Sequence, residues 1–213
     1  MKTLTRRDFM KHSALAGAVL ASPFSKVRGA NSDIRVAVAG VNGRGRALVG
    51  DFQSVQGVRI VALCDVDGGV LDKQVKKLKD GNIDVQGYGD YRRMLEDKSI
   101  DVVAVATPDH WHVPLAAAAI VAGKDVYVEK PMSHTIAEGR YLVNLARKHG
   151  KMVQHGTQSR SSEGITEGIE YLKSGKLGKV RMAKAINCQL RGPIGRAPDS
   201  EAPPGVNYDL WLG

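Results

Sequence analysis

The stretch IRVAVAGVNGRG, residues 34–45, decides the fold. Its first six residues are mostly apolar and β-branched, which predicts a strand buried on both faces, as in a parallel sheet. A glycine-rich turn follows, and the chain then enters a predicted helix around 47–49. A strand, a glycine turn and a helix in this order are typical of a dinucleotide-binding unit, in which backbone N–H groups at the helix start face the pyrophosphate.

The glycine turn departs from the usual pattern G-x-G-x-x-G at its middle position. Asn42 stands where the second glycine is expected, and Gly43 comes one residue later. Asparagine tolerates a positive φ better than other non-glycine residues, so we expect the turn to survive the exchange. The candidate cofactor-binding residues of the turn are Gly40, Asn42, Gly43, Arg44 and Gly45.

A carboxylate follows the second predicted strand, which spans 58–63. Asp65 lies 25 residues after Gly40, near the spacing expected for an acid that accepts a hydrogen bond from the ribose 2′-hydroxyl. An acid there repels a 2′-phosphate, so the sequence favours NAD over NADP, although Arg44 and Arg46 lie close enough in sequence to accept a phosphate. The alternative is that Asp65 caps a helix beginning at Asp67.

The remaining pattern alternates strands and helices up to about residue 155. Such alternation predicts an α/β fold: a doubly wound parallel sheet of the Rossmann type, with helices on both faces. Ligands bind at the carboxyl ends of these strands. The predicted strands are 102–106, 126–128 and 152–155, and the predicted helices are 90–95, 113–121 and 136–149.

Polar clusters follow three of these strands, at 107–112, 129–131 and 156–160. Because the carboxyl ends of parallel strands share one edge of the sheet, we expect the clusters to converge on one crevice. The two cysteines, Cys64 and Cys188, form no disulfide framework, and no metal-ligand spacing is present. We therefore predict a dinucleotide site and no metal site.

From about residue 33 onward the chain resembles the Gfo/Idh/MocA oxidoreductases, the family of glucose–fructose oxidoreductase and inositol dehydrogenase. The resemblance rests on the glycine turn, on Cys64-Asp65, and on the motifs ATPDHWH (106–112) and AGKDVYVEKP (122–131). The segments GTQSRS (156–161) and YDLWLG (208–213) resemble the exported branch of the family.

The resemblance implies roles for individual residues. Lys130 would contact both the cofactor and the substrate hydroxyl, where its cation stabilises a developing alkoxide, and Pro131 would fix the backbone that aims it, through a cis bond if one forms. Glu129 would meet cofactor hydroxyls. The alternatives are a surface lysine at 130 and helix-start histidines without chemistry at 110 and 112. The further candidate cofactor-binding residues are Thr107, Pro108, His110, Trp111, His112, Glu129, Lys130 and Gln158.

The first thirty residues predict an export signal. An R-R-x-F-x-K pattern begins at Arg6, and an apolar run over 14–21 follows it, too short to span a membrane. We expect export through the twin-arginine translocation machinery to the periplasm, by a signal that is either cleaved or kept as an anchor; a basic arm is the alternative. The net charge is +9, and residues 1–29 hold six basic residues and one acid. The rest carries only +4, which removes the main argument for nucleic-acid binding.

Residues 159–213 read as the incomplete start of a second α/β domain, after a signal at 1–30 and a dinucleotide-binding domain at 31–158. Ile165, Ile169 and Leu172 mark the apolar face of a helix, and 179–189 is predicted as a strand. Family members continue into a substrate and oligomerisation domain that supplies a catalytic Asp and His. We therefore expect a C-terminally truncated sequence, inactive by itself, whose full-length form is a homo-oligomer.

Three functions remain open at this point. The first is an NAD-dependent oxidoreductase that transfers a hydride to or from a secondary alcohol of a sugar or polyol. The second is a glycosidase that uses NAD for transient oxidation, an exception to two-carboxylate glycoside hydrolysis. The third is a nucleotide-binding fragment without activity. Net accumulation of NADH separates the first from the second.

Overall fold

A computed structural model describes residues 33–186, 192–193 and 195–213, so the predicted export signal lies outside the described residues. Its centre is a six-stranded sheet in the order β3-β2-β1-β4-β5-β6, with every neighbouring pair parallel. This is the Rossmann strand order. Strands β2 and β3 are added on one side of β1, and strands β4, β5 and β6 are added on the other side. The strands are β1 (Ile34–Ala39), β2 (Val58–Cys64), β3 (Gln86–Tyr88), β4 (Val102–Val105), β5 (Asp125–Glu129) and β6 (Val153–Gly156).

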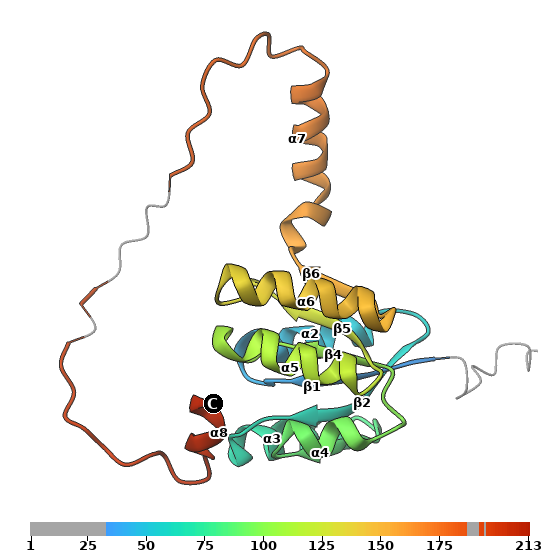
Figure 1. Ribbon diagram of the computed structural model, residues 1–213, viewed down its shortest axis with the longest axis vertical. Coiled ribbons are helices and arrows are strands. Elements are labelled where there is room, and N and C mark those ends of the chain that lie inside the picture. Colours follow the sequence, from blue (N-terminus) through green and yellow to red (C-terminus); the bar gives the residue numbers. More distant parts are fainter. Residues whose placement is uncertain (1–32, 187–191, 194) are drawn as a thin grey trace, which may run out of the picture.

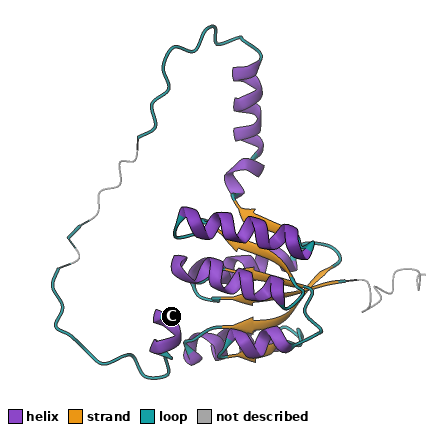
Figure 2. Ribbon diagram, viewed as in Figure 1, coloured by secondary structure: helices purple, strands orange, loops and turns teal. Residues whose placement is uncertain are grey.

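Helices cover both faces of the sheet (Figures 1 and 2). Residues of α4, α5 and α6 pack on one face, and residues of α2 and α3 pack on the other. The predicted fold class, a doubly wound α/β sheet, is therefore confirmed. The helices are α2 (Gly43–Gln53), α3 (Gly68–Asp80), α4 (Tyr91–Glu96), α5 (Asp109–Val121), α6 (Ile136–His149), the 3₁₀ turn η2 (Gln158–Ser161), α7 (Glu163–Lys173) and α8 (Tyr208–Leu212).

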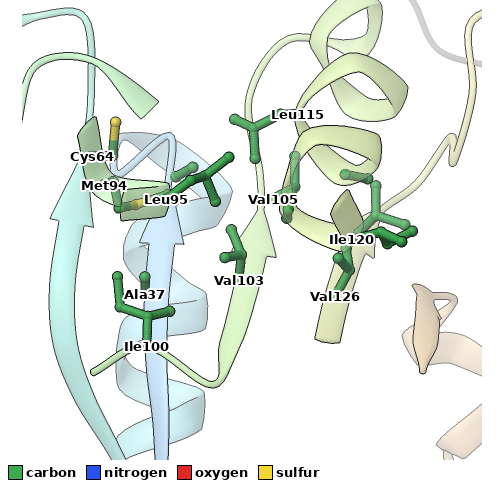
Figure 3. Close-up of a cluster of buried hydrophobic side chains, with 14 of the residues drawn as sticks. Ala37, Cys64, Met94, Leu95, Ile100, Val103, Val105, Leu115, Ile120 and Val126 are labelled. Atoms are coloured by element: carbon green, nitrogen blue, oxygen red, sulfur yellow. The ribbon is translucent and has the colours of Figure 1, made fainter. Parts of the chain in front are cut away.

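The core lies on both sides of β1, because successive side chains of a strand point to opposite faces. Val36 and Val38 pack toward α2 and α3, whereas Ala37 packs toward the face that α5 covers. Figure 3 shows this second cluster, in which Met94 of α4 and Ile120 of α5 lie against strands β1, β4 and β5. The side chains of β1 therefore contribute to the core on both faces of the sheet.

Local signals explain why several elements begin and end where they do. The Thr135 hydroxyl accepts a hydrogen bond from the Glu138 backbone, and the Glu138 carboxylate accepts one from the Thr135 backbone, which is a capping box at the start of α6. The helix ends at Gly150, whose φ of 61° lies in the left-handed region. The predicted bounds of this helix and of the strand at 34–39 agree with the structure.

Other boundaries differ from the sequence-based expectation. Helix α5 begins at Asp109, four residues before the predicted start, and the short edge strand β3 was not predicted. The strand predicted over 179–189 is wrong for 179–186, which form neither helix nor strand, and 187–189 lie outside the described residues. A strand needs a neighbour to satisfy its backbone groups, and no described strand pairs with this segment.

The C-terminal residues lie partly away from the sheet. Helix α7 projects beyond β6, whereas α8 lies near α3 and α4 (Figure 1). Among the described residues, no helix has the length and apolar character needed to span a membrane. The same residues contain no cluster of three or more potential metal ligands.

Candidate functional site

Glycines bring the turn after β1 into close contact with its neighbours. A Cβ atom added to Gly45 would lie 1.6 Å from the Gly40 carbonyl oxygen, and one added to Gly40 would lie 2.6 Å from the Ala106 oxygen. Neither space admits a side chain. The predicted reason for accepting Asn42 is wrong, because the residue has a φ of −88° and the positive values fall on Gly40 and Gly43. Asn42 instead caps α2 by accepting a hydrogen bond from the Gly43 N–H.

Asp65 connects the end of β2 with the glycine turn. One carboxylate oxygen accepts a hydrogen bond from the Val41 N–H at 2.8 Å, and the other accepts one from the Asp67 N–H at 3.0 Å. The alternative role as a helix cap belongs to Asp67, whose side chain accepts from the Val70 N–H. Each Asp65 oxygen retains a second lone pair, so the carboxylate is held in place and can still accept from a ligand.

A cavity of about 470 Å³ lies at the carboxyl ends of β1, β2 and β4, which is the switch point of the sheet. It falls within the range of roughly 300–1,000 Å³ found for small-molecule sites. Its wall contains a buried hydroxyl, Thr107 Oγ1, that has no hydrogen-bond partner among the described residues. The predicted site residues that line it are Gly40, Asn42, Asp65, Thr107, Pro108 and Trp111.

Arg44 and Glu129 join the glycine turn to the end of β5. The Glu129 carboxylate is buried and lies 2.8 Å from Arg44 Nε, and it also accepts from the Tyr127 hydroxyl and the Lys130 N–H. Burial acts to raise the pKa of Glu129, but the hydrogen bond from Arg44 and the other donors outweigh it and lower the pKa. The carboxylate is therefore charged at neutral pH and is held by protein groups.

Lys130 follows β5 and has an exposed side chain. The bond between Lys130 and Pro131 is cis, as the sequence suggested. The His112 ring is buried next to this bond. Its Nδ1 atom is hydrogen-bonded to the Pro131 carbonyl oxygen, and its Nε2 atom lies 2.9 Å from the Thr107 carbonyl oxygen. His112 stands in the first turn of α5 and joins the two loops that carry candidate residues.

The other predicted residues do not line the cavity: Gly43, Arg44, Gly45, His110, His112, Glu129, Lys130 and Gln158. The His110 ring bonds the Trp211 carbonyl oxygen at 2.9 Å and turns toward α8. Gln158 is exposed at the start of η2, after β6. Because β6 is the edge strand beyond β5, Gln158 lies away from the cavity at the ends of β2, β1 and β4.

The family model described as "Oxidoreductase family, NAD-binding Rossmann fold" (GFO_IDH_MocA) matches residues 34–157, more than half of the chain. The chain belongs to this family. The match ends one residue after β6. The resemblance inferred from the sequence motifs is thereby confirmed, and the chain is a Gfo/Idh/MocA protein.

Two relatives of this Gfo/Idh/MocA chain carry different names. Glycosyl hydrolase family 109 protein 2 of Shewanella sp. (strain ANA-3) is 40% identical over 119 residues, covering 54% of this chain and 26% of that protein. Inositol 2-dehydrogenase of Salmonella typhimurium is 34% identical over 134 residues, covering 61% and 38%. The chain thus spans between a quarter and two fifths of the length of these curated relatives.

A solved structure supports the fold of the family. Scyllo-inositol dehydrogenase from Lactobacillus casei, crystallised with NAD(H) and scyllo-inositol, superimposes with a TM-score of 0.63 at 22% sequence identity. The superposition covers 68% of this chain and 42% of that chain. At this identity the likeness speaks for the fold alone.

The cavity of this Gfo/Idh/MocA chain fits the dinucleotide that the family implies. Asp65 offers acceptor oxygens for ribose hydroxyls, and Thr107 Oγ1 is a buried hydroxyl without a hydrogen-bond partner in the described part of the chain. A Cβ atom added to Gly43 at the start of α2 meets no atom within 4 Å, so that point of the turn is open to a phosphate. The residues present therefore suit an adenosine diphosphate group.

Several residues of the cavity were not singled out from the sequence. Tyr91 and Cys64 line it, and so do residues of the C-terminal segment. Burial and the neighbouring Asp65 raise the pKa of the Cys64 thiol to about 12, so it stays protonated and is not a nucleophile. A helix-start tyrosine or a strand-end cysteine carries no local signal of ligand contact, because both patterns are common in protein cores.

Proposed function

We propose that this chain forms the cofactor-binding part of an NAD-dependent oxidoreductase acting on a secondary alcohol of a sugar or polyol. The observation that carries the proposal is the cavity at the switch point, with the Asp65 carboxylate fixed by Val41 and Asp67 backbone N–H groups. Membership of the family and the inositol dehydrogenase among its relatives support it. When bound, the nicotinamide ring supplies the hydride acceptor or donor.

Lys130 is the residue proposed to act on the substrate. Its ammonium donates hydrogen bonds, and at the exposed end of β5 it has room to reach a substrate hydroxyl. A cation at that oxygen stabilises the negative charge that develops as the hydride leaves. Glu129 and His112 then have positioning roles: the first accepts the Lys130 backbone N–H, and the second holds the Pro131 carbonyl.

We further propose that NAD is preferred over NADP. A charged carboxylate at Asp65 accepts from a ribose 2′-hydroxyl and repels a 2′-phosphate. Arg44, one of the two arginines that could compensate for such a phosphate, is engaged with Glu129 and with Asp51. This engagement supports the preference for NAD.

A second reaction class is favoured by one specific observation, the 40% identity to a glycosyl hydrolase family 109 protein. In that case the cofactor would be oxidised and reduced within one turnover, and no NADH would accumulate. The same Lys130 would be required, because the sugar hydroxyl is still oxidised transiently.

Product analysis tests these alternatives. The protein is incubated with NAD⁺ and either polyols, including inositols, or aryl glycosides. NADH formation from polyols supports the dehydrogenase, sugar release without NADH supports the glycosidase, and NAD⁺ binding without either supports the non-catalytic fragment. Lys130→Met should abolish turnover and retain NAD⁺ binding, whereas the matched control Lys148→Met, on the exposed side of α6, should keep both. Unchanged turnover in Lys130→Met would refute its assigned role.

Export is proposed on sequence grounds alone. Fusing residues 1–30 to a folded reporter should carry it to the periplasm, and the double substitution Arg6→Lys, Arg7→Lys should retain it in the cytoplasm. Periplasmic reporter despite the double substitution would contradict the twin-arginine route.

A further inference from the structure

The C-terminal strap, defined here as residues 203–213, ends in helix α8, which lies near α3 (Figure 1). It contributes five cavity-lining residues: Pro203, Val206, Tyr208, Leu210 and Trp211. These residues face a cavity whose opposite wall is the glycine turn and the end of β2. The strap is therefore the outer wall of the cavity, supplied from a hundred or more residues further along the chain.

The strap is fixed at its first end to the turn between β2 and α3. The Asn207 N–H donates to the Val66 oxygen at 2.9 Å, and the Gly68 N–H donates to the Gly205 oxygen at 3.0 Å. Asp67 and Val206 form an antiparallel bridge between these bonds. This end is thus attached directly beside Asp65, the residue assigned to the ribose.

The strap is fixed at its second end to the first turn of α5. The Trp211 carbonyl oxygen accepts from Trp111 Nε1 at 3.2 Å and from His110 Nε2 at 2.9 Å. Because a carbonyl oxygen only accepts, the His110 ring carries its proton on Nε2 in this arrangement. The sequence had assigned both α5 residues to the cofactor, and here they hold the strap.

The strap carries two aromatic rings. Tyr208 and Trp211 are stacked, with centroids 5.7 Å apart and planes 7° apart, and both line the cavity. Their side chains nevertheless remain 47% and 41% exposed. Aromatic surface on a cavity wall suits a planar base, since stacking on a ring is favourable for every nucleobase.

We propose that the C-terminal strap closes the adenosine half of the dinucleotide site and slows release of the cofactor, with Tyr208 and Trp211 as binding residues. The proposal rests on the proposed dinucleotide binding. The half is identified by position: the strap lies beside Asp65 at the end of β2, whereas Lys130 follows β5, three strands away across the sheet. The strap therefore affects how long the cofactor stays bound and not the hydride transfer at the nicotinamide end.

The alternative is a strap that blocks the site, and the open volume of the cavity argues against it. About 470 Å³ stays open between the strap and the glycine turn, within the roughly 300–1,000 Å³ of ligand sites. The strap is anchored at both ends and leaves this volume open, so a ligand fits between the strap and the glycine turn. Opening of either anchor would widen the path by which an adenosine group leaves the cavity.

Release kinetics test the proposal. The chain and its variants Tyr208→Ala and Trp211→Ala are loaded with etheno-NAD, and dissociation is followed after adding excess NAD⁺, while calorimetry measures ADP-ribose binding. Loss of one stacking ring should speed release and weaken ADP-ribose binding by about tenfold. Trp111→Phe, which keeps an aromatic ring at this position and removes the indole N–H that anchors Trp211, should speed release by a smaller factor. Leu212→Ala, on the same helix but outside the cavity wall, should release at the original rate.

The outcomes separate this inference from the proposed function. If the unaltered chain binds neither NAD⁺ nor ADP-ribose, the proposed function fails at its cofactor. If it binds both and the two alanine variants release etheno-NAD at the original rate, the strap has no role in retention. Tighter binding in the variants would show a blocking strap and also overturn the inference. Circular dichroism that matches the unaltered chain confirms that the variants are folded.

Discussion

Residues 33–157 and residues 158–213 differ in how their structure is stabilised. The first region has a core of fully buried side chains on both faces of its sheet, including Val38, Ile60 and Ile120. The helices of the second region, α7 and α8, contain no buried residue. Burial of apolar side chains is the main source of folding free energy, so the first region determines its own fold and the second depends on what it contacts.

This difference extends to the candidate site. The inner wall of the cavity consists of strand ends and glycine turns, whose geometry the core determines. The outer wall is the C-terminal strap, held by a few hydrogen bonds and ring contacts. We infer that the inner wall decides which cofactor is bound, and that the outer wall affects how long it stays.

The largest predicted effect comes from replacing glycine in the two regions. Gly45→Ala forces a Cβ atom to 1.6 Å from the Gly40 oxygen and should lower the free energy of unfolding by roughly 3 kcal/mol or more. Gly168→Ala in α7 meets no atom within 4 Å and should cause no loss. Urea unfolding followed by circular dichroism measures both, and equal midpoints for the two variants would contradict the comparison.

The next effect comes from shortening an apolar side chain in each region. Ile120→Ala in α5 opens a cavity in the core and should cost about 2–5 kcal/mol. Leu172→Ala in α7, where the side chain is 45% exposed, should change stability by no more than about 0.5 kcal/mol. A comparable loss from Leu172→Ala in the same unfolding experiment would mean that α7 is packed more tightly than its exposure indicates.

The ion pair between Arg44 and Glu129 should contribute less than the core. Arg44→Ala leaves the buried Glu129 charge with only Tyr127 and the Lys130 N–H, at a cost of about 1–2 kcal/mol at neutral pH. Because the pKa of Glu129 is lowered in the folded protein, its contribution exists above the ordinary glutamate pKa and is lost as the pH falls. The difference between Arg44→Ala and the unaltered protein should therefore shrink in acid.

A matched control lies in the second region. Lys173 pairs with Glu170 at 2.9 Å on α7, but both side chains are about two-thirds exposed. Lys173→Ala should leave the unfolding midpoint unchanged at every pH, because exposed pairs contribute little. A pH-independent penalty for Arg44→Ala would show that its effect does not act through Glu129.

The smallest predicted effect concerns the ion pair between Arg35 in β1 and Asp101, the residue before β4. Hydrogen bonds from Arg35 lower the pKa of Asp101 to about 2. An unfolded aspartate titrates near 3.9, so this contribution to stability is complete above about pH 4 and is lost as the pH falls toward 2. Asp101→Asn should flatten the decline of the urea midpoint in that window, and an unchanged decline would assign the acid sensitivity to other carboxylates. The pair is partly exposed, which keeps the effect modest.

The first region could be predicted from sequence because its signals are local. The apolar strand at 34–39 is followed directly by a glycine. The helix at 136–149 is bounded by the capping box of Thr135 and Glu138 and by Gly150. The edge strand β3 could not be predicted, since its three residues Gln86, Gly87 and Tyr88 show no alternation and pair only because β2 lies beside them.

The candidate site was predictable on its inner wall only. The glycine turn, Asp65 and Thr107 stand at strand ends, where the topology places ligands. The positions of Tyr208 and Trp211 depend on contacts with residues about a hundred positions earlier, such as that between Trp111 and Trp211, and no local pattern reports such a contact. The same limit explains His110, which the sequence assigned to the cofactor and the structure turns toward Trp211.

We propose that the inner wall, with Asp65 fixed at the end of β2, selects NAD over NADP. Calorimetric titration of the chain with NAD⁺ and with NADP⁺ tests it most directly. We predict that NAD⁺ binds at least about tenfold more tightly, since a 2′-phosphate would meet the Asp65 carboxylate, and that Asp65→Ala removes the preference. Tighter binding of NADP⁺, or binding of neither nucleotide, would contradict the account.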